Sequence, residues 1–108
     1  MELRKVTAII RTAVFEKVEK RLQAMGVHGM SVARVRGYGQ YANYFATDWL
    51  VTHLRIEIFT ERTKAEQFAA AIVEAAHCGA PGDGIVVILP VEKMFRIRSK
   101  SEVRPDEL

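Results

Sequence analysis

The sequence predicts a small α+β domain whose elements follow one another in the order βαββαβ. Apolar and polar residues alternate over 3–11 and 50–59, as they do in half-buried strands. Apolar residues recur every three or four positions over 12–25 and 63–76, as they do in amphipathic helices. A chain of 108 residues, 49% of them apolar and 27% charged, has the size and composition of one folded domain.

The same composition excludes several classes of protein. The chain is too apolar for a disordered protein and lacks the repeats of a collagen or a coiled coil. No apolar run approaches the roughly 20 residues of a membrane span, and the N-terminus lacks the apolar core of a signal peptide. We therefore expect a cytoplasmic protein without membrane insertion. The net charge of +3 is compatible with an anionic ligand but too small to indicate nucleic acid.

The N-terminal part predicts a strand followed by a helix. The strand presents Val6, Ala8 and Ile10 on one face. Thr12 stands where the N-cap of the helix is expected, and Gly26 ends the helical pattern in the position of a C′ residue.

The middle of the chain predicts two strands and a second helix. The strands run from Met30 to Val35 and from Leu50 to Phe59, and the alternation in the second of them indicates one buried and one polar face. Thr63-x-x-Glu66 has the form of a capping box at the start of the helix, which we expect to end at Gly79.

The C-terminal part completes the fold. The all-apolar run Ile85 to Leu89 predicts a short central strand that Pro90 interrupts, and 94–97 predicts a further brief strand. We assign 1–98 to the domain and 99–108 to a polar, flexible tail. Two βαβ halves with an antiparallel sheet and both helices on one face make a ferredoxin-like βαββαβ sandwich.

Two stretches have the composition of an anion-binding site. The segment 79–84 holds three glycines, whose left-handed conformations can turn several backbone N–H groups toward phosphate oxygens. Arg96 and Arg98 point the same way from an extended segment, a spacing that suits phosphate capture. The alternatives are a plain helix-to-strand turn for the first stretch and a solvated strand face for the second.

The connection over 37–49 concentrates the large aromatic residues. It holds all three tyrosines and the only tryptophan of the chain, namely Tyr38, Tyr41, Tyr44 and Trp49. Such a concentration is typical either of a binding loop or of an aromatic cluster packed on the sheet or on a neighbouring subunit. Both interpretations stay open at this point.

Catalytic signatures are missing from the sequence. It contains no Gly-x-Ser-x-Gly motif, and His77 is adjacent to Cys78, so the two side chains point apart on a helix. The three histidines and the single cysteine lack the spacing of metal ligands. We therefore predict no catalytic residues, no metal site and no enzymatic activity.

Several motifs, in their order along nearly the whole chain, resemble the P-II signal-transduction family. The matching motifs are Ala8-Ile9-Ile10-Arg11, Gly26-Val27-His28-Gly29-Met30-Ser31-Val32, Gly37-Tyr38-Gly39, Arg55-Ile56-Glu57-Ile58, Gly79-x-x-Gly82-Asp83-Gly84, Val91-Glu92 and Arg96-Ile97-Arg98. Their combination is specific, although each motif alone is not. The resemblance implies a ferredoxin-like homotrimer that binds adenine nucleotides in the clefts between its subunits.

The resemblance also implies which residues carry function. The expected nucleotide contacts are Gly29, Met30 and Ser31 by the adenine, Gly37 near the phosphates, Gly82, Asp83 and Gly84 in the phosphate loop, and Arg96 and Arg98 from the neighbouring subunit. The expected contacts to a partner or effector, in the loop, are Tyr38, Gln40, Tyr41, Tyr44 and Trp49. The protein partner is unidentified and would be a transporter or an enzyme.

The sequence departs from the family pattern at two points. Ile85 stands where the phosphate loop of the family has a lysine, and Gln40-Tyr41 stand where the family has Arg-Gln. That glutamine position supports magnesium and 2-oxoglutarate in nitrogen-sensing members, and the loop is shorter here. We therefore expect AMP or ADP to bind at least as well as ATP, as in a divergent member similar to the short-loop relatives linked to bicarbonate transport and carboxysomes.

Two other functions remain as alternatives on the same fold. One is a small enzyme of the acylphosphatase type, for which Arg11 and Asn43 are present, although not in a recognisable motif. The other is a CutA-like trimer that handles metal ions. Turnover of an acyl phosphate would identify the first, and metal titration would identify the second.

Overall fold

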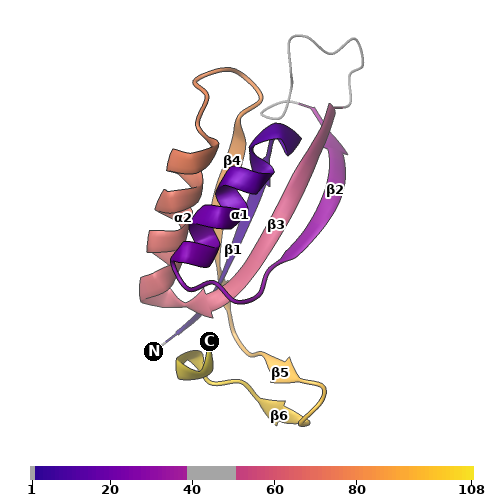
Figure 1. The fold of residues 1–108 in the computed structure, drawn as a ribbon. Coiled ribbons are helices and arrows are strands. Elements are labelled where there is room, and N and C mark those ends of the chain that lie inside the picture. Colours follow the sequence, from indigo (N-terminus) through magenta and orange to yellow (C-terminus); the bar gives the residue numbers. More distant parts are fainter. Residues whose placement is uncertain (1, 39–50) are drawn as a thin grey trace.

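Figure 1 shows the computed structural model, which describes residues 2–38 and 51–108. Four antiparallel strands form a sheet in the order β2-β3-β1-β4, and two helices cover one of its faces. The main elements are β1 (Leu3–Ile10), α1 (Phe15–Ala24), β2 (Ser31–Gly37), β3 (Val51–Glu61), α2 (Arg62–Ala76) and β4 (Gly84–Val91). The predicted ferredoxin-like sandwich is confirmed.

The core lies between the sheet and the helices. β1 pairs with β3 on one side and with β4 on the other, so that Val6 lies opposite both Ile58 and Ile88. The predicted buried face of β1 is confirmed, because each of its three apolar side chains is 1% exposed. The helices add Val18, Leu22, Ala65, Phe68 and Ile72 to the same cluster. Burial of this apolar surface is the main term that holds the helices on the sheet.

The first helix starts later than predicted, and Thr12 is not its N-cap. A short 3₁₀ turn, η1 (Thr12–Val14), comes first and is closed by a hydrogen bond from the Val14 amide to the Arg11 carbonyl. α1 then begins at Phe15 with no side-chain cap. The predicted end is confirmed, since Gly26 follows the C-cap residue with a φ of +92°.

The second helix is capped by Glu61, and the predicted capping box is wrong. β3 continues to Glu61, so the helix begins directly afterwards and this residue occupies the N-cap. Its carboxylate accepts hydrogen bonds from the amides of Thr63 and Lys64, at 3.1 and 3.0 Å, and from the Thr63 hydroxyl. The Thr63 hydroxyl contributes most to holding the pKa of Glu61 below its usual range.

β4 is an edge strand, and its prediction as a central strand is wrong. It pairs with β1 only, among the strands of the described chain, and it continues through Pro90, which lies opposite Arg4. Proline is tolerated there because an edge strand leaves one row of backbone groups unpaired. The apolar run reflects an exposed surface, since Val87, Ile88 and Leu89 are 37–38% exposed.

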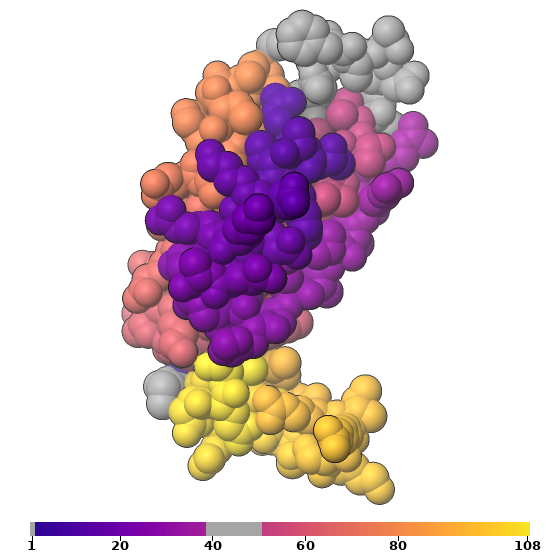
Figure 2. Space-filling view, in the orientation of Figure 1, coloured from indigo at the N-terminus to yellow at the C-terminus, as the bar shows by residue number. Residues whose placement is uncertain are grey.

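The residues after β4 fold back against the end of the sandwich. β5 (Phe95–Arg96), within the predicted brief strand, pairs with β6 (Ser101–Glu102) in a separate two-stranded sheet, and the 3₁₀ turn η2 (Pro105–Glu107) follows. Where we expected a polar tail, Val103 is 2% exposed and its amide donates to the Met94 carbonyl at 2.7 Å. Figure 2 shows these residues as a lobe below the helices.

Candidate functional site

The connection between α2 and β4 contains the predicted glycine loop. Its glycines Gly79, Gly82 and Gly84 have φ values of +84°, +93° and +100°, which confirms the predicted left-handed conformations. Gly84 also lies against β1, because a Cβ there would be 1.7 Å from the carbonyl oxygen of Ile9. Only glycine fits at this position, because other residues rarely adopt this φ value and because no space is left for a side chain.

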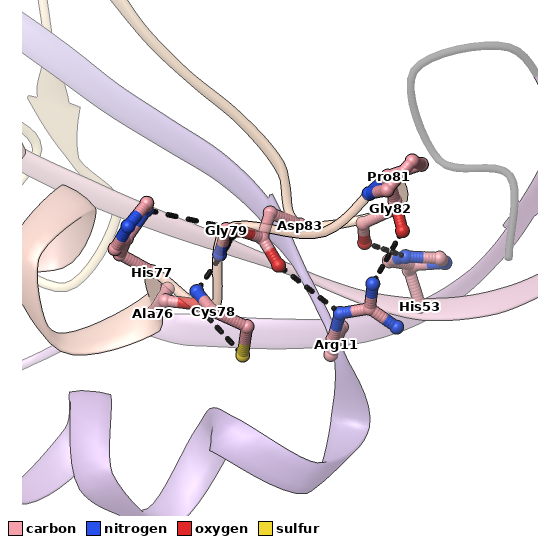
Figure 3. A network of polar contacts seen from close by, with 9 residues as sticks. All are labelled: Arg11, His53, Ala76, His77, Cys78, Gly79, Pro81, Gly82 and Asp83. Atoms are coloured by element: carbon pink, nitrogen blue, oxygen red, sulfur yellow. Dashed lines mark hydrogen bonds and ion pairs between the residues drawn. The ribbon is translucent and has the colours of Figure 1, made fainter.

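Asp83 organises this loop from within (Figure 3). Its carboxylate accepts hydrogen bonds from the amides of Cys78 and Gly79, both at 2.9 Å, and from Nε of Arg11 at 3.2 Å. The hydrogen bond from the Cys78 amide, more than those from Gly79 and Arg11, lowers the pKa of Asp83 to about 2, although burial acts in the opposite direction. The carboxylate is therefore ionised at neutral pH and committed to the loop.

Two side chains from neighbouring strand ends hold the other side of the loop. The guanidinium of Arg11 donates to the Pro81 carbonyl as well as to Asp83, and Nε2 of His53 lies 2.9 Å from the Gly82 carbonyl (Figure 3). A carbonyl oxygen only accepts, so Nε2 carries the proton in this contact. The sequence did not predict this role for Arg11 or for His53. The signal that could have predicted this role is the pairing of β1 with β3, which brings the end of β1 beside the start of β3.

The other end of the sheet carries a pocket of about 790 Å³. It lies between the α1–β2 connection, β3 and the lobe after β4. Four of the predicted nucleotide-binding residues line it together: Gly29, Met30, Ser31 and Arg96. The pocket also has residues that the sequence analysis did not assign, namely Met25, Glu57, Phe59, Lys64, Phe68, Met94 and Glu107. Apolar walls with a few polar groups are typical of a small-molecule site.

The predicted site residues fall into two groups at opposite ends of the sheet. Gly37 ends β2, and Gly82 to Gly84 precede and begin β4, at the same end of the sheet (Figure 1). The pocket lies at the other end, where β2 begins and beyond the end of β4. Strands rise about 3.3 Å per residue, so the two ends of β4 lie roughly 23 Å apart. Arg98 is exposed in the turn after β5 and does not line the pocket.

The predicted partner loop falls mostly outside the described residues. Among the residues outside the described ranges are Gln40, Tyr41, Tyr44 and Trp49, together with Asn43 and Leu50. Tyr38 is described and is 67% exposed.

Two other features are missing from the described part of the chain. It contains no group of three or more His, Cys, Asp or Glu side chains placed to hold a metal ion. None of its helices is both long enough and apolar enough to cross a membrane.

Comparison with known proteins gives one consistent result. The family model described as "Nitrogen regulatory protein P-II" matches residues 3–101. The chain is 36% identical over 104 residues to nitrogen regulatory protein P-II 1 of Methanothermobacter thermautotrophicus, with 90% of each chain covered. It is 32% identical over 104 residues to nitrogen regulatory protein P-II of Azospirillum brasilense, covering 90% of this chain and 93% of the relative.

A solved structure agrees with these sequence relatives. The crystal structure of Arabidopsis thaliana PII bound to citrate superposes with a TM-score of 0.80 at 30% identity, covering 94% of this chain and 89% of that one. Sequence and fold therefore agree over nearly the whole chain, and the resemblance seen in the motifs is confirmed. The chain belongs to the nitrogen regulatory protein P-II family, a family of regulatory signalling proteins.

Proposed function

We propose that this P-II protein binds an adenine nucleotide, AMP or ADP, in clefts between the subunits of a homotrimer. Nucleotide binding changes the state of the loop 37–49, which then binds or releases a protein partner. Such coupling requires that the two loop states differ in nucleotide affinity. The short loop favours a partner in inorganic-carbon metabolism, such as a bicarbonate transporter or an enzyme, over the partners of nitrogen-sensing members.

The separation of the predicted site residues is the observation that carries this proposal. The pocket groups Gly29, Met30, Ser31 and Arg96, whereas the glycine loop lies at the other end of the same sheet. A nucleotide held in the pocket of one chain does not reach the glycine loop of that chain across roughly 23 Å of strand. A second copy, with its glycine loop beside the pocket of the first, would complete the site.

The exposed apolar surface supports self-association. Val87, Ile88 and Leu89 form an exposed apolar run on the edge strand β4, and Phe95 and Ile97 are 61% and 94% exposed. An apolar edge strand that is left uncovered promotes association with other chains. The subunits of a homotrimer would cover this surface.

The charges at both ends of the sheet support AMP or ADP over ATP. Ile85 lies in β4 opposite Ile9 and supplies no charge next to the glycine loop. Arg11 lies beside the loop, but its guanidinium is engaged with Asp83 and the Pro81 carbonyl. The two arginines predicted to bind the phosphates, Arg96 and Arg98, suffice for one or two phosphate groups.

Calorimetric titration with AMP, ADP and ATP tests this proposal, with light scattering on the same samples. We expect a trimer, binding of AMP or ADP at least as tight as that of ATP, and no gain from magnesium with 2-oxoglutarate. A stable monomer at micromolar concentration would contradict the shared site. Much tighter binding of ATP with magnesium and 2-oxoglutarate than of ADP would contradict the role given to Ile85 and Tyr41.

A further inference from the structure

Among its described residues, the pocket is lined by two permanently positive side chains, those of Lys64 and Arg96. Both contact the last two residues of the chain. Nη1 of Arg96 lies 3.3 Å from a carboxylate oxygen of Glu107, and Nζ of Lys64 lies 3.4 Å from the backbone oxygen of Leu108. Glu107 and Leu108 themselves line the pocket. An anion that enters the pocket would therefore find both cations already in contact with groups of the same chain.

These contacts come from a short segment that follows a buried residue. Val103 is buried and its amide is bonded to Met94. Residues 104–108, here called the C-terminal segment, are held by one 3₁₀ turn, exposed ion pairs, the long contact from Lys64 and the partly buried Pro105 and Leu108. The side chains of Arg96 and Glu107 are 50% and 32% exposed. Exposed pairs of this kind are weak, so a competing anion can replace them. The segment can leave the pocket without unfolding the residues before it.

We propose that Glu107 is a built-in competitor for the nucleotide phosphates, and that the C-terminal segment lowers the affinity of the pocket until the nucleotide displaces it. This inference rests on the proposed function and adds regulation of the same site. Glu107 supplies to Arg96 the kind of oxygen ligand that a phosphate group supplies. Nucleotide binding and release of the C-terminal segment are then linked, since each occupant excludes the other from Arg96.

The chain offers a matched pair of variants for the test. Glu107→Gln removes the negative charge that faces Arg96. Asp106→Asn removes the same charge one residue earlier, where the carboxylate lies 3.7 Å from Arg104. We expect Glu107→Gln to tighten ADP binding about two- to fivefold by calorimetry, as the loss of one exposed pair allows, and Asp106→Asn to leave it nearly unchanged. In an Arg96→Ala background the effect of Glu107→Gln should vanish.

Each outcome decides between the two proposals. If ADP binds the wild type and Glu107→Gln changes nothing, or if both charge variants tighten binding equally, the competition is refuted while the nucleotide site stands. If neither ADP nor AMP binds the wild type or the variant, the proposed function fails, and the competition fails with it. Amide hydrogen exchange adds a direct readout: ADP should speed exchange at residues 107–108, and slower exchange would show that the segment closes over the nucleotide instead.

Discussion

The two ends of the sheet hold their polar groups in different ways. At the glycine loop, the carboxylate of Asp83 has three hydrogen-bond donors and is 24% exposed, and His53 is buried against the Gly82 carbonyl. At the pocket, Arg96 and Lys64 have long, exposed contacts to the C-terminal segment. Multiple charge-assisted bonds fix a geometry, whereas single exposed pairs do not. The glycine loop is therefore held in one geometry, whereas the contacts at the pocket can be exchanged.

Replacement of Gly84 tests the rigid end with the largest expected effect. In Gly84→Ala, the new methyl group would meet the Ile9 carbonyl, and the φ of +100° would be strained. We expect a loss of about 3 kcal/mol or more in the free energy of unfolding, measured by urea denaturation. The matched control is Gly29→Ala, where the Cβ has no atom within 4 Å, and which should change stability by less than about 0.5 kcal/mol. Equal free energies of unfolding for Gly84→Ala and Gly29→Ala would show that the loop accommodates the methyl group without strain.

The pH dependence of stability tests the same end through Asp83. Its pKa falls from 3.8 in the unfolded chain to about 2 in the folded one, so the unfolded state binds the proton more readily. The stabilisation is complete above pH 4 and is lost as the pH falls through 2. We expect Asp83→Asn to cost about 1–3 kcal/mol at pH 7 and to flatten the loss of stability between pH 4 and 2.

The lowered pKa of Glu61 also makes stability fall at acid pH, in the wild type and in Asp83→Asn alike. Some acid dependence of stability should therefore remain in Asp83→Asn. The control Glu92→Gln removes an exposed carboxylate just after the far end of β4 and should change the free energy of unfolding at pH 7 by less than about 0.5 kcal/mol. If the free energy of unfolding of Asp83→Asn fell with pH as steeply as that of the wild type, Asp83 would not be a source of the acid dependence.

The smallest effect is expected at the changeable end. Arg104 is 73% exposed and pairs with Glu107 at 3.3 Å and Asp106 at 3.7 Å. Arg104→Ala should change the free energy of unfolding by less than about 0.5 kcal/mol, because exposed pairs contribute little. A loss of 1 kcal/mol or more, measured under the same denaturant conditions, would show that the C-terminal segment is as firmly held as the glycine loop.

The sequence predicted the sandwich well and its boundaries less well. Periodicity identified the core face of β1 and both helices, because burial on one face leaves a repeating pattern. It did not identify Glu61 as the cap, because the predicted strand stopped two residues before this carboxylate. The run 85–89 suggested burial on both faces, whereas β4 is an edge with an exposed apolar surface. An unbroken apolar run has the same pattern in a buried strand as in an exposed edge strand, so periodicity does not separate the two.

The candidate site was also predicted in part. The glycine loop was found because its signal is local, within a few residues. The arginine pair was predicted from an extended segment, but only Arg96 lies in β5 and lines the pocket, whereas Arg98 lies in the turn that follows. The contact from Arg11 to Asp83 joins residues 72 positions apart, and the pocket combines Lys64 with residues 107–108, so both depend on the tertiary fold. The grouping of the residues predicted to bind the nucleotide, at two ends of the sheet, likewise required the strand pairing.

The central claim is that two subunits complete each nucleotide site, and mixing of defective subunits tests it most directly. One variant, Asp83→Ala, disturbs the glycine loop, and the other, Arg96→Ala/Arg98→Ala, removes the cations proposed to bind the phosphates. Each alone should bind ADP weakly. When the two are refolded together, an intact loop from one subunit can face intact arginines from its neighbour. Calorimetry should then recover a fraction of sites with near wild-type affinity. A mixture that binds ADP no better than its parents would contradict the account.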